Sequence, residues 1–167
     1  MGRVEKSRDM GKKMFKICNA TNKDIPQITD LKRCWYNEWD YSPPDNYYQV
    51  YEDTILGLLE SNTESVKVAY VNNAVVGYAI GCSKLYNESG VCMDIVFDVG
   101  YIFEVYIKQE FRTKGIAKAL LESLENHFKE SGKKSIFGII YVWNKEAQML
   151  VESCGWKLSG QTYSKRI

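Results

Sequence analysis

The residues best suited to chemistry lie in a short basic turn at residues 108–115. An amphipathic pattern follows at once and predicts a helix from Ile116. Gly115, at the strand-to-helix junction, allows the backbone to approach a ligand closely. The first turn of the following helix carries unpaired N–H groups and the positive end of the helix dipole. Together these features predict an anion site suited to a diphosphate. Positive charge nearby comes from Arg112, Lys114 and Lys118.

The turn on its own does not decide between a binding site and an ordinary surface corner. It lacks the G-x-x-x-x-G-K-[ST] pattern of a P-loop and the G-x-G-x-x-G pattern of a dinucleotide site. A basic turn before an amphipathic helix is, taken alone, more often a solvated corner. A nucleotide-binding protein unrelated to acyl transfer therefore remains an alternative.

Two spaced motifs carry a resemblance to a known family. The segment Arg112-x-x-Gly115-x-Ala117 resembles the R/Q-x-x-G-x-G/A signature of the GNAT superfamily, the acyl-CoA-dependent N-acetyltransferases. The family's second element, N-x-x-A-x-x-L-Y-x-x-x-G-F, is matched by residues 144–156. The motifs and the elements between them cover about a third of the chain, and the rest agrees with the family in the order of its elements.

Three positions depart from the family pattern. Ala117 stands for the commoner glycine, and Trp156 replaces phenylalanine but keeps an aromatic ring. Val151 stands where many members have a tyrosine that is proposed to protonate the leaving thiolate. Valine cannot donate a proton, so another group protonates the thiolate, or the thiolate leaves without a dedicated acid, or the chain is not catalytic.

The resemblance implies acetyl-CoA as donor and direct transfer to an amine. The acceptor is expected to be a primary amine of a small molecule such as a polyamine or an aminosugar, and no metal is expected. The alternatives are a non-catalytic acyl-CoA-binding regulator and an acetyltransferase for protein N-termini or lysines. The residues expected at the coenzyme are Val105, Tyr106, Ile107, Arg112, Thr113, Lys114, Gly115, Ile116, Ala117, Lys118, Asn144 and Ala147.

Transfer to an amine requires a deprotonated nucleophile, and deprotonating an alkylammonium group at pH 7 costs about 4.6 kcal/mol. Glu104 is the candidate base, and by strand alternation it shares a face with Tyr106. The alternative for Glu104 is a surface or ion-paired carboxylate. Tyr163 is the candidate acid, with packing as its alternative. Asn144 is expected to cap a helix and to contact the coenzyme's pantetheine arm.

The acceptor pocket is expected from the first two helices and their connection. Aromatic rings beside carboxylates suit a cationic amine. The alternative is a helix with a buried tryptophan face and solvated charges. The residues expected to contact the acceptor are Trp35, Glu38, Trp39 and Tyr141.

Hydrophobic periodicity predicts the elements that position these residues. Helices are expected at 24–39, 47–59, 116–128 and 145–152. Strands are expected at 14–20, 66–70, 74–82, 99–107 and 136–142, with a terminal strand or hairpin at 156–166. The apolar run 136–142 is typical of a strand buried on both faces. The predicted fold class is α/β: a GNAT-like, mostly antiparallel mixed sheet with a splayed parallel pair and helices on both faces.

The composition of the chain limits which classes of protein it can belong to. The 167 residues fit one domain at 14–167 behind a flexible tail at 1–13, and 45% hydrophobic with 26% charged residues excludes disorder. A net charge of +1 gives no reason to expect nucleic acid, and no apolar run is long enough for a membrane span.

The cysteines and the single histidine also bear on where the protein works. Five cysteines without a C-x-x-C pair argue against a disulfide framework, and one histidine argues against zinc. With no secretory signal at the N-terminus, a cytoplasmic location is expected. A homodimer is possible, because dimers are common in the family.

Overall fold

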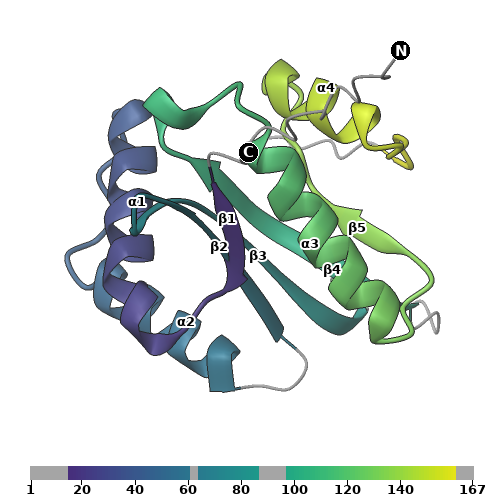
Figure 1. Ribbon diagram of the computed structural model, residues 1–167, viewed down its shortest axis with the longest axis horizontal. Coiled ribbons are helices and arrows are strands. Elements are labelled where there is room, and N and C mark those ends of the chain that lie inside the picture. Colours follow the sequence, from purple (N-terminus) through teal and green to yellow (C-terminus); the bar gives the residue numbers. More distant parts are fainter. Residues whose placement is uncertain (1–14, 61–63, 87–96, 161–167) are drawn as a thin grey trace, which may run out of the picture.

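The computed structural model describes residues 15–60, 64–86 and 97–160 (Figure 1). Its elements, in chain order, are β1 (Lys16–Asn19), η1 (Asn22–Asp24), α1 (Ile25–Glu38), α2 (Tyr47–Glu60), β2 (Glu64–Val71), β3 (Ala74–Tyr86), β4 (Phe97–Ile107), η2 (Gln109–Phe111), α3 (Ile116–Glu130), β5 (Ile136–Gly138) and α4 (Lys145–Ser153). The expected tail at 1–13 lies outside the described residues.

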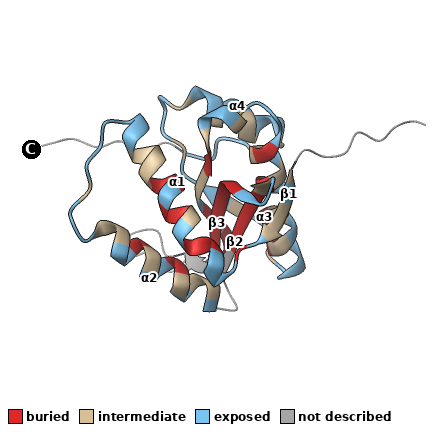
Figure 2. Cartoon of the chain, turned by 60° about the vertical axis from the view of Figure 1, so that its left-hand side comes forward, coloured by how far each residue is buried: buried red, intermediate tan, exposed pale blue. Residues whose placement is uncertain are grey.

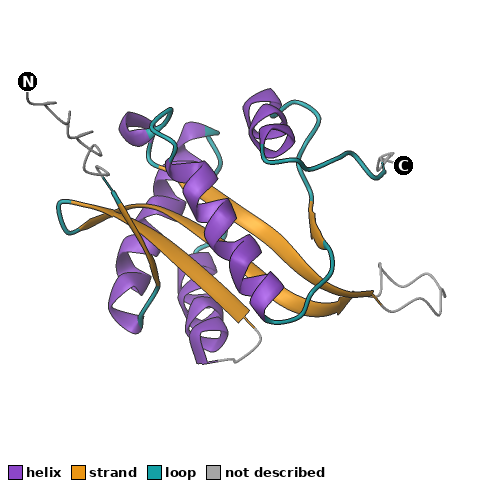
Figure 3. Ribbon diagram, turned by 45° about the vertical axis from the view of Figure 1, so that its right-hand side comes forward, coloured by secondary structure: helices purple, strands orange, loops and turns teal. Residues whose placement is uncertain are grey.

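The five strands form one sheet in the order β1-β2-β3-β4-β5. The neighbours pair antiparallel except β4 and β5, which are parallel. Helices α1 and α2 lie on one face of the sheet and α3 lies on the other (Figures 1 and 3). This mixed sheet between helical layers confirms the expected fold class.

Each face of the sheet has its own apolar core, and each core uses the periodic residues of its helices. On the first face Ile28 and Ile55 are fully buried, and on the second face Leu120, Leu124 and Phe128 are fully buried. Figure 2 shows the buried parts of α1, α2, β2 and β3 in red. A spacing of three or four residues puts these side chains on one side of each helix.

The prediction of a long strand buried on both faces at 136–142 is wrong. Only three residues pair with β4, and the chain then turns away from it. Ile139 and Val142 are 67% and 73% exposed. Residues 156–160 form no strand either, and the rest of the predicted terminal strand lies outside the described residues.

Strand β4 contains a β-bulge that the sequence does not reveal. Glu104 pairs with Ile80 while Ile102 pairs with Gly81, so Phe103 is an extra residue. Ile102 and Ile107 pack on the α3 side, and Tyr106 packs on the side of α1 and α2. The extra residue thus reverses the alternation and moves Glu104 to the face of α1 and α2.

Gly100 on β4 lies where the Phe128 ring of α3 meets the sheet. A Cβ at position 100 would lie 2.5 Å from two ring atoms. Gly100→Ala is therefore expected to lower the free energy of unfolding by about 1–3 kcal/mol, because the ring has to move. Urea denaturation measures this change. Gly57→Ala on α2 is the control: its Cβ would meet nothing within 4 Å. It is expected to stabilise the protein by about 0.5–1 kcal/mol.

Candidate active site

The basic turn is built as a left-handed bend that leads into α3. Thr113 and Gly115 have φ angles of 63° and 79°. The Ala119 N–H donates to the Gly115 carbonyl at 3.1 Å, which starts the ladder of the helix. The amides of residues 116–118 precede that bond and have no intrahelical acceptor. The structure thus presents free main-chain donors at the start of α3, with no acidic side chain among the residues of that first turn.

The Arg112 guanidinium lies away from those amides. Its Nε donates to the Ile107 carbonyl at 2.9 Å, and its Nη2 donates to both carboxylate oxygens of Glu38 at 2.6 and 2.8 Å. The Tyr106 hydroxyl donates to Glu38 Oε1 at 2.7 Å. Burial, and next this hydrogen bond, raise the pKa of Tyr106, so its hydroxyl stays protonated. Glu38, which the sequence places at the acceptor, joins α1 to the turn in this structure.

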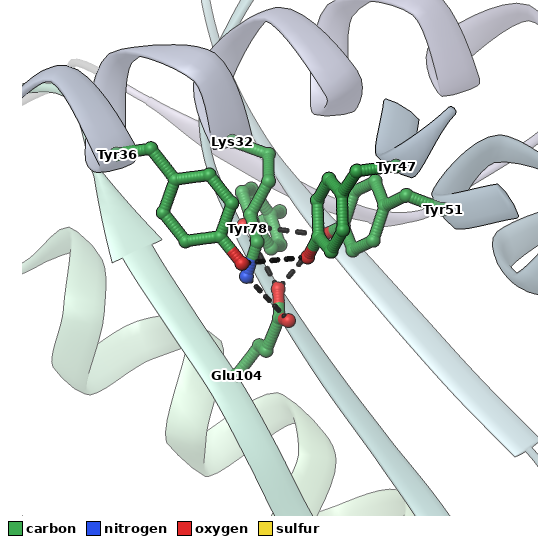
Figure 4. Close-up of polar contacts among 6 residues, drawn as sticks. All are labelled: Lys32, Tyr36, Tyr47, Tyr51, Tyr78 and Glu104. Carbon is green, nitrogen blue, oxygen red and sulfur yellow. Dashed lines mark hydrogen bonds and ion pairs between the residues drawn. The ribbon is translucent and has the colours of Figure 1, made fainter. Parts of the chain in front are cut away.

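Glu104 lies in a polar cluster beneath α1 and α2 (Figure 4). Lys32 Nζ donates to Glu104 Oε1 at 2.7 Å, and the side chains are 5% and 14% exposed. The Tyr51 and Tyr78 hydroxyls donate to Oε2 at 2.7 and 3.0 Å. Burial is the main cause that raises the pKa of both tyrosines, and the Glu104 charge adds to it. Glu104 is therefore an ion-paired carboxylate in this structure, the alternative that the sequence left open.

Aromatic rings surround the Lys32 ammonium. Its Nζ lies 4.4 Å from the ring centroid of Trp35, 4.8 Å from that of Tyr36 and 5.2 Å from that of Tyr51. These rings, together with Lys32 and Glu104, are called the Lys32 cage below. Sequence reasoning missed Lys32, although it stands one helical turn before Tyr36 on a helix that carries Ile28 and Trp35 on its apolar side.

A row of five aromatic side chains runs from the connection after β5 across α1 to β4. Tyr141 stacks on Trp143 with ring centroids 5.4 Å apart, and Trp143 meets Trp39 edge-on at 4.8 Å. Trp39 meets Trp35 at 5.6 Å, and Trp35 stacks on Tyr106 at 5.7 Å. This aromatic row brings together the expected Trp35, Trp39 and Tyr141. It adds Trp143, which the sequence analysis did not place at the acceptor.

Strands β4 and β5 diverge beside the turn. Their pairing ends at Ile102 and Gly138, while β4 continues to Ile107. Beyond that point the β5 side of β4 has no strand partner among the residues that the structure describes. Val105 and Ile107 point toward α3, as the alternation predicts. The divergence leaves main-chain groups of β4 next to the bend.

The second motif forms the start of α4. Asn144 is its N-cap, and its Oδ1 accepts the Ala147 N–H at 3.1 Å. The expected cap is thus confirmed. Val151 packs against the apolar cluster on the α3 side and has no proton to donate. Tyr163 lies outside the described residues.

A cavity of about 550 Å³ lies at the far end of α3. It is lined by residues of α3, of the connection to β5 and of the segment after α4, among them Glu125, Lys129, Lys134 and Trp156. It contains none of the residues that the sequence singled out for chemistry, so it is not part of this site.

Neither a metal site nor a membrane span is found in the described ranges. Within residues 15–60, 64–86 and 97–160, no three His, Cys, Asp or Glu side chains are grouped to hold a metal ion. Within the same ranges, no helix has the length and apolar character needed to cross a bilayer.

Solved structures with the same fold include several acetyltransferases. The aminoglycoside N-acetyltransferase AAC(6')-Iy in complex with CoA is 14% identical, with a TM-score of 0.73 over 92% of this chain and 94% of that one. The aminoglycoside acetyltransferase meta-AAC0020 from an uncultured soil metagenomic sample, in complex with sisomicin, is 20% identical with a TM-score of 0.68 over 92% and 95%. A ribosomal-protein-alanine N-acetyltransferase from Brucella melitensis biovar Abortus 2308 is 20% identical with a TM-score of 0.66 over 92% and 99%. At these identities the likeness shows the fold.

The family itself is shown by sequence. No curated protein matches the chain. The model of the acetyltransferase (GNAT) family matches residues 25–156, which include α1, the bend and the second motif. The bend before α3, the diverging strands and this match agree, and the chain belongs to the acetyltransferase (GNAT) family.

Proposed function

We propose that the protein transfers the acetyl group of acetyl-CoA directly to a primary amine of a small molecule. The observation that carries the proposal is the bend at Thr113 and Gly115, which leads directly into the first turn of α3, where the main-chain amides have no intrahelical acceptor. A diphosphate has the charge and the acceptor oxygens for such a site. The fold neighbours include proteins in complex with CoA and with acetyl-CoA.

In this proposal the coenzyme lies between the bend and the diverging strands. Main-chain amides of residues 113–118 hold the diphosphate, and Lys114 and Lys118 add positive charge. The main chain of Val105, Tyr106 and Ile107 flanks the pantetheine arm. Asn144 contacts the arm with the side-chain N–H groups that its capping bond leaves over.

The reaction forms a C–N bond between the amine and the acetyl carbon and breaks the C–S bond of the thioester. The amine loses a proton and the thiolate gains one. Contact with the aromatic row desolvates the amine, which lowers its pKa and favours the neutral nucleophile. A thiolate is a good leaving group, so valine at position 151 is compatible with turnover.

Glu104 remains the candidate base, but only one of its two carboxylate oxygens can accept the proton. Oε2 already accepts two tyrosine hydroxyls, so a proton has to arrive at Oε1, beside Lys32. A backbone N–H at the free edge of β4 would stabilise the negative charge on the thioester oxygen in the transition state.

The test mixes the protein and acetyl-CoA with a panel of small primary amines and measures release of free thiol. Thiol release with at least one amine, and a matching acetylated product by mass spectrometry, are expected. Calorimetry with CoA shows separately whether the coenzyme binds. A folded protein that binds CoA and acetylates no amine would contradict the proposal.

A non-catalytic acyl-CoA-binding regulator is the second candidate, because Val151 packs against the α3-side core and cannot act as an acid. Val151→Tyr separates the two candidates. A regulator is expected to be inactive until this change adds the tyrosine found in many relatives. An enzyme is expected to be active with valine, and to change little on substitution.

A further inference from the structure

A lysine of the chain itself, Lys32, occupies the place where an ammonium ligand would bind. An aromatic cage next to a carboxylate is the arrangement that binds alkylammonium ligands. Here the ammonium in that arrangement is Lys32, whose Nζ lies 2.7 Å from Glu104 and 4.4 Å from the Trp35 ring centroid. Because the Lys32 side chain is only 5% exposed, solvent does not compete with it.

The second carboxylate on this side is neutralised as well. Glu38 holds the Arg112 guanidinium at 2.6 Å. Asp40 follows Trp39 and is exposed to solvent, where a carboxylate attracts a cation only weakly. The two carboxylates that contact the aromatic row and the cage, Glu38 and Glu104, each have an internal cation. A second ammonium brought to the Lys32 cage would lose its hydration without gaining an unpaired carboxylate there.

The aromatic row offers an acceptor apolar ring faces and no unpaired charge. Trp35 belongs both to the Lys32 cage and to the aromatic row, so the row leads directly to the cage. Toward solvent, Trp39, Trp143 and Tyr141 are 43%, 57% and 60% exposed. Exposed indole and phenol faces bind flat apolar groups by stacking. The surface therefore suits an acceptor with an aromatic body and one amino group.

We propose that the acceptor is a singly charged amine with a flat apolar body, and that Lys32 is the specificity-determining residue that excludes amines with a second charge. The proposal rests on the proposed function and names the substrate class for the same site. It differs from the polyamine or aminosugar that the sequence favours.

The first test compares 2-phenylethylamine, 1,4-diaminobutane and sisomicin as acceptors. A kcat/KM at least about tenfold higher for 2-phenylethylamine is expected, as one lost charge–charge or stacking contact of about 1.4 kcal/mol would give. Faster acetylation of 1,4-diaminobutane or sisomicin would overturn the inference and leave the proposed function standing. No acetylation of any amine would count against the proposed function itself.

The second test uses Lys32→Met, which keeps a four-atom unbranched stem and removes the terminal ammonium. Glu104 then has no cation, and the cage is open to the second ammonium of a diamine. The ratio of kcat/KM for 1,4-diaminobutane to that for 2-phenylethylamine is expected to rise at least about tenfold. Lys23→Met, at an exposed lysine on η1, is the matched control and is expected to leave the ratio unchanged. A folded Lys32→Met protein with an unchanged ratio would overturn the inference.

A third measurement keeps the inference testable if Lys32→Met does not fold. Trp39→Ala is expected to raise KM for 2-phenylethylamine about tenfold with little change in the affinity for CoA, because it removes an exposed face of the row. Leu158→Ala, at a position 79% exposed, is the control. If Trp39→Ala leaves that KM unchanged, the row does not bind the acceptor.

Discussion

Replacing Gly115 by valine is expected to weaken CoA binding at least about a hundredfold. The φ angle of 79° at this position belongs to the left-handed region, which costs an L-residue about 1–2 kcal/mol and a β-branched residue more. The bend is then expected to relax and turn its amides away from a common point. The new side chain would also enter the space beside these amides, where, its chain neighbours aside, nothing lies within 4 Å of an added Cβ. Calorimetric titration with CoA measures the loss.

The matched control for this change is Gly132→Val at the opposite end of α3. Gly132 also has a φ angle of 79°, and, its chain neighbours aside, nothing lies within 4 Å of an added Cβ. Both variants are expected to lose similar amounts of thermal stability, and only Gly115→Val is expected to lose CoA affinity. If both variants bind CoA like the unchanged protein, the bend is not the coenzyme site.

The helices could be predicted from the sequence because their periodicity is a local property. Residues such as Ile116, Leu120 and Leu124 repeat every four positions, and the helix they predict starts where α3 starts. The bulge at Phe103 could not be predicted, because it depends on the register between β3 and β4. The sequence nevertheless predicts correctly that Glu104 shares a face of the strand with Tyr106, because residues 104 to 106 all follow the bulge and alternate regularly.

The partners of the charged residues could not be predicted for the same reason. Lys32 and Glu104 are 72 positions apart, and Glu38 and Arg112 are 74 positions apart. Nothing in a single sequence links such pairs. The apolar run at 136–142 led to a wrong prediction. Its hydrophobic residues suggest a buried strand, but Tyr141 is 60% exposed next to the candidate site.

Neutralising either Glu38 or Arg112 is expected to weaken CoA binding about tenfold or more. The sequence places Arg112 at the coenzyme, but in this structure its guanidinium binds Glu38 and the Ile107 carbonyl, so we expect it to act by holding the bend. The guanidinium holds the bend to α1 through Glu38 and to β4 through the Ile107 carbonyl. Charge-assisted hydrogen bonds of this kind contribute about 1.5–3 kcal/mol. Without them the amides of residues 113–118 lose their fixed orientation. Calorimetry on Glu38→Gln and Arg112→Gln measures each loss.

The double variant decides how Arg112 acts. If Arg112 works by holding the bend, Glu38→Gln and Arg112→Gln remove the same interaction, and combining them is expected to be no worse than either alone. If the guanidinium instead bound phosphate, Glu38→Gln would release it and leave the affinity for CoA unchanged or higher. In that case only Arg112→Gln would lower the affinity for CoA. The exposed pair of Lys108 and Glu110, 2.8 Å apart in the same turn, provides the control. Glu110→Gln is expected to change the affinity little, because an exposed ion pair contributes little to the geometry of the bend.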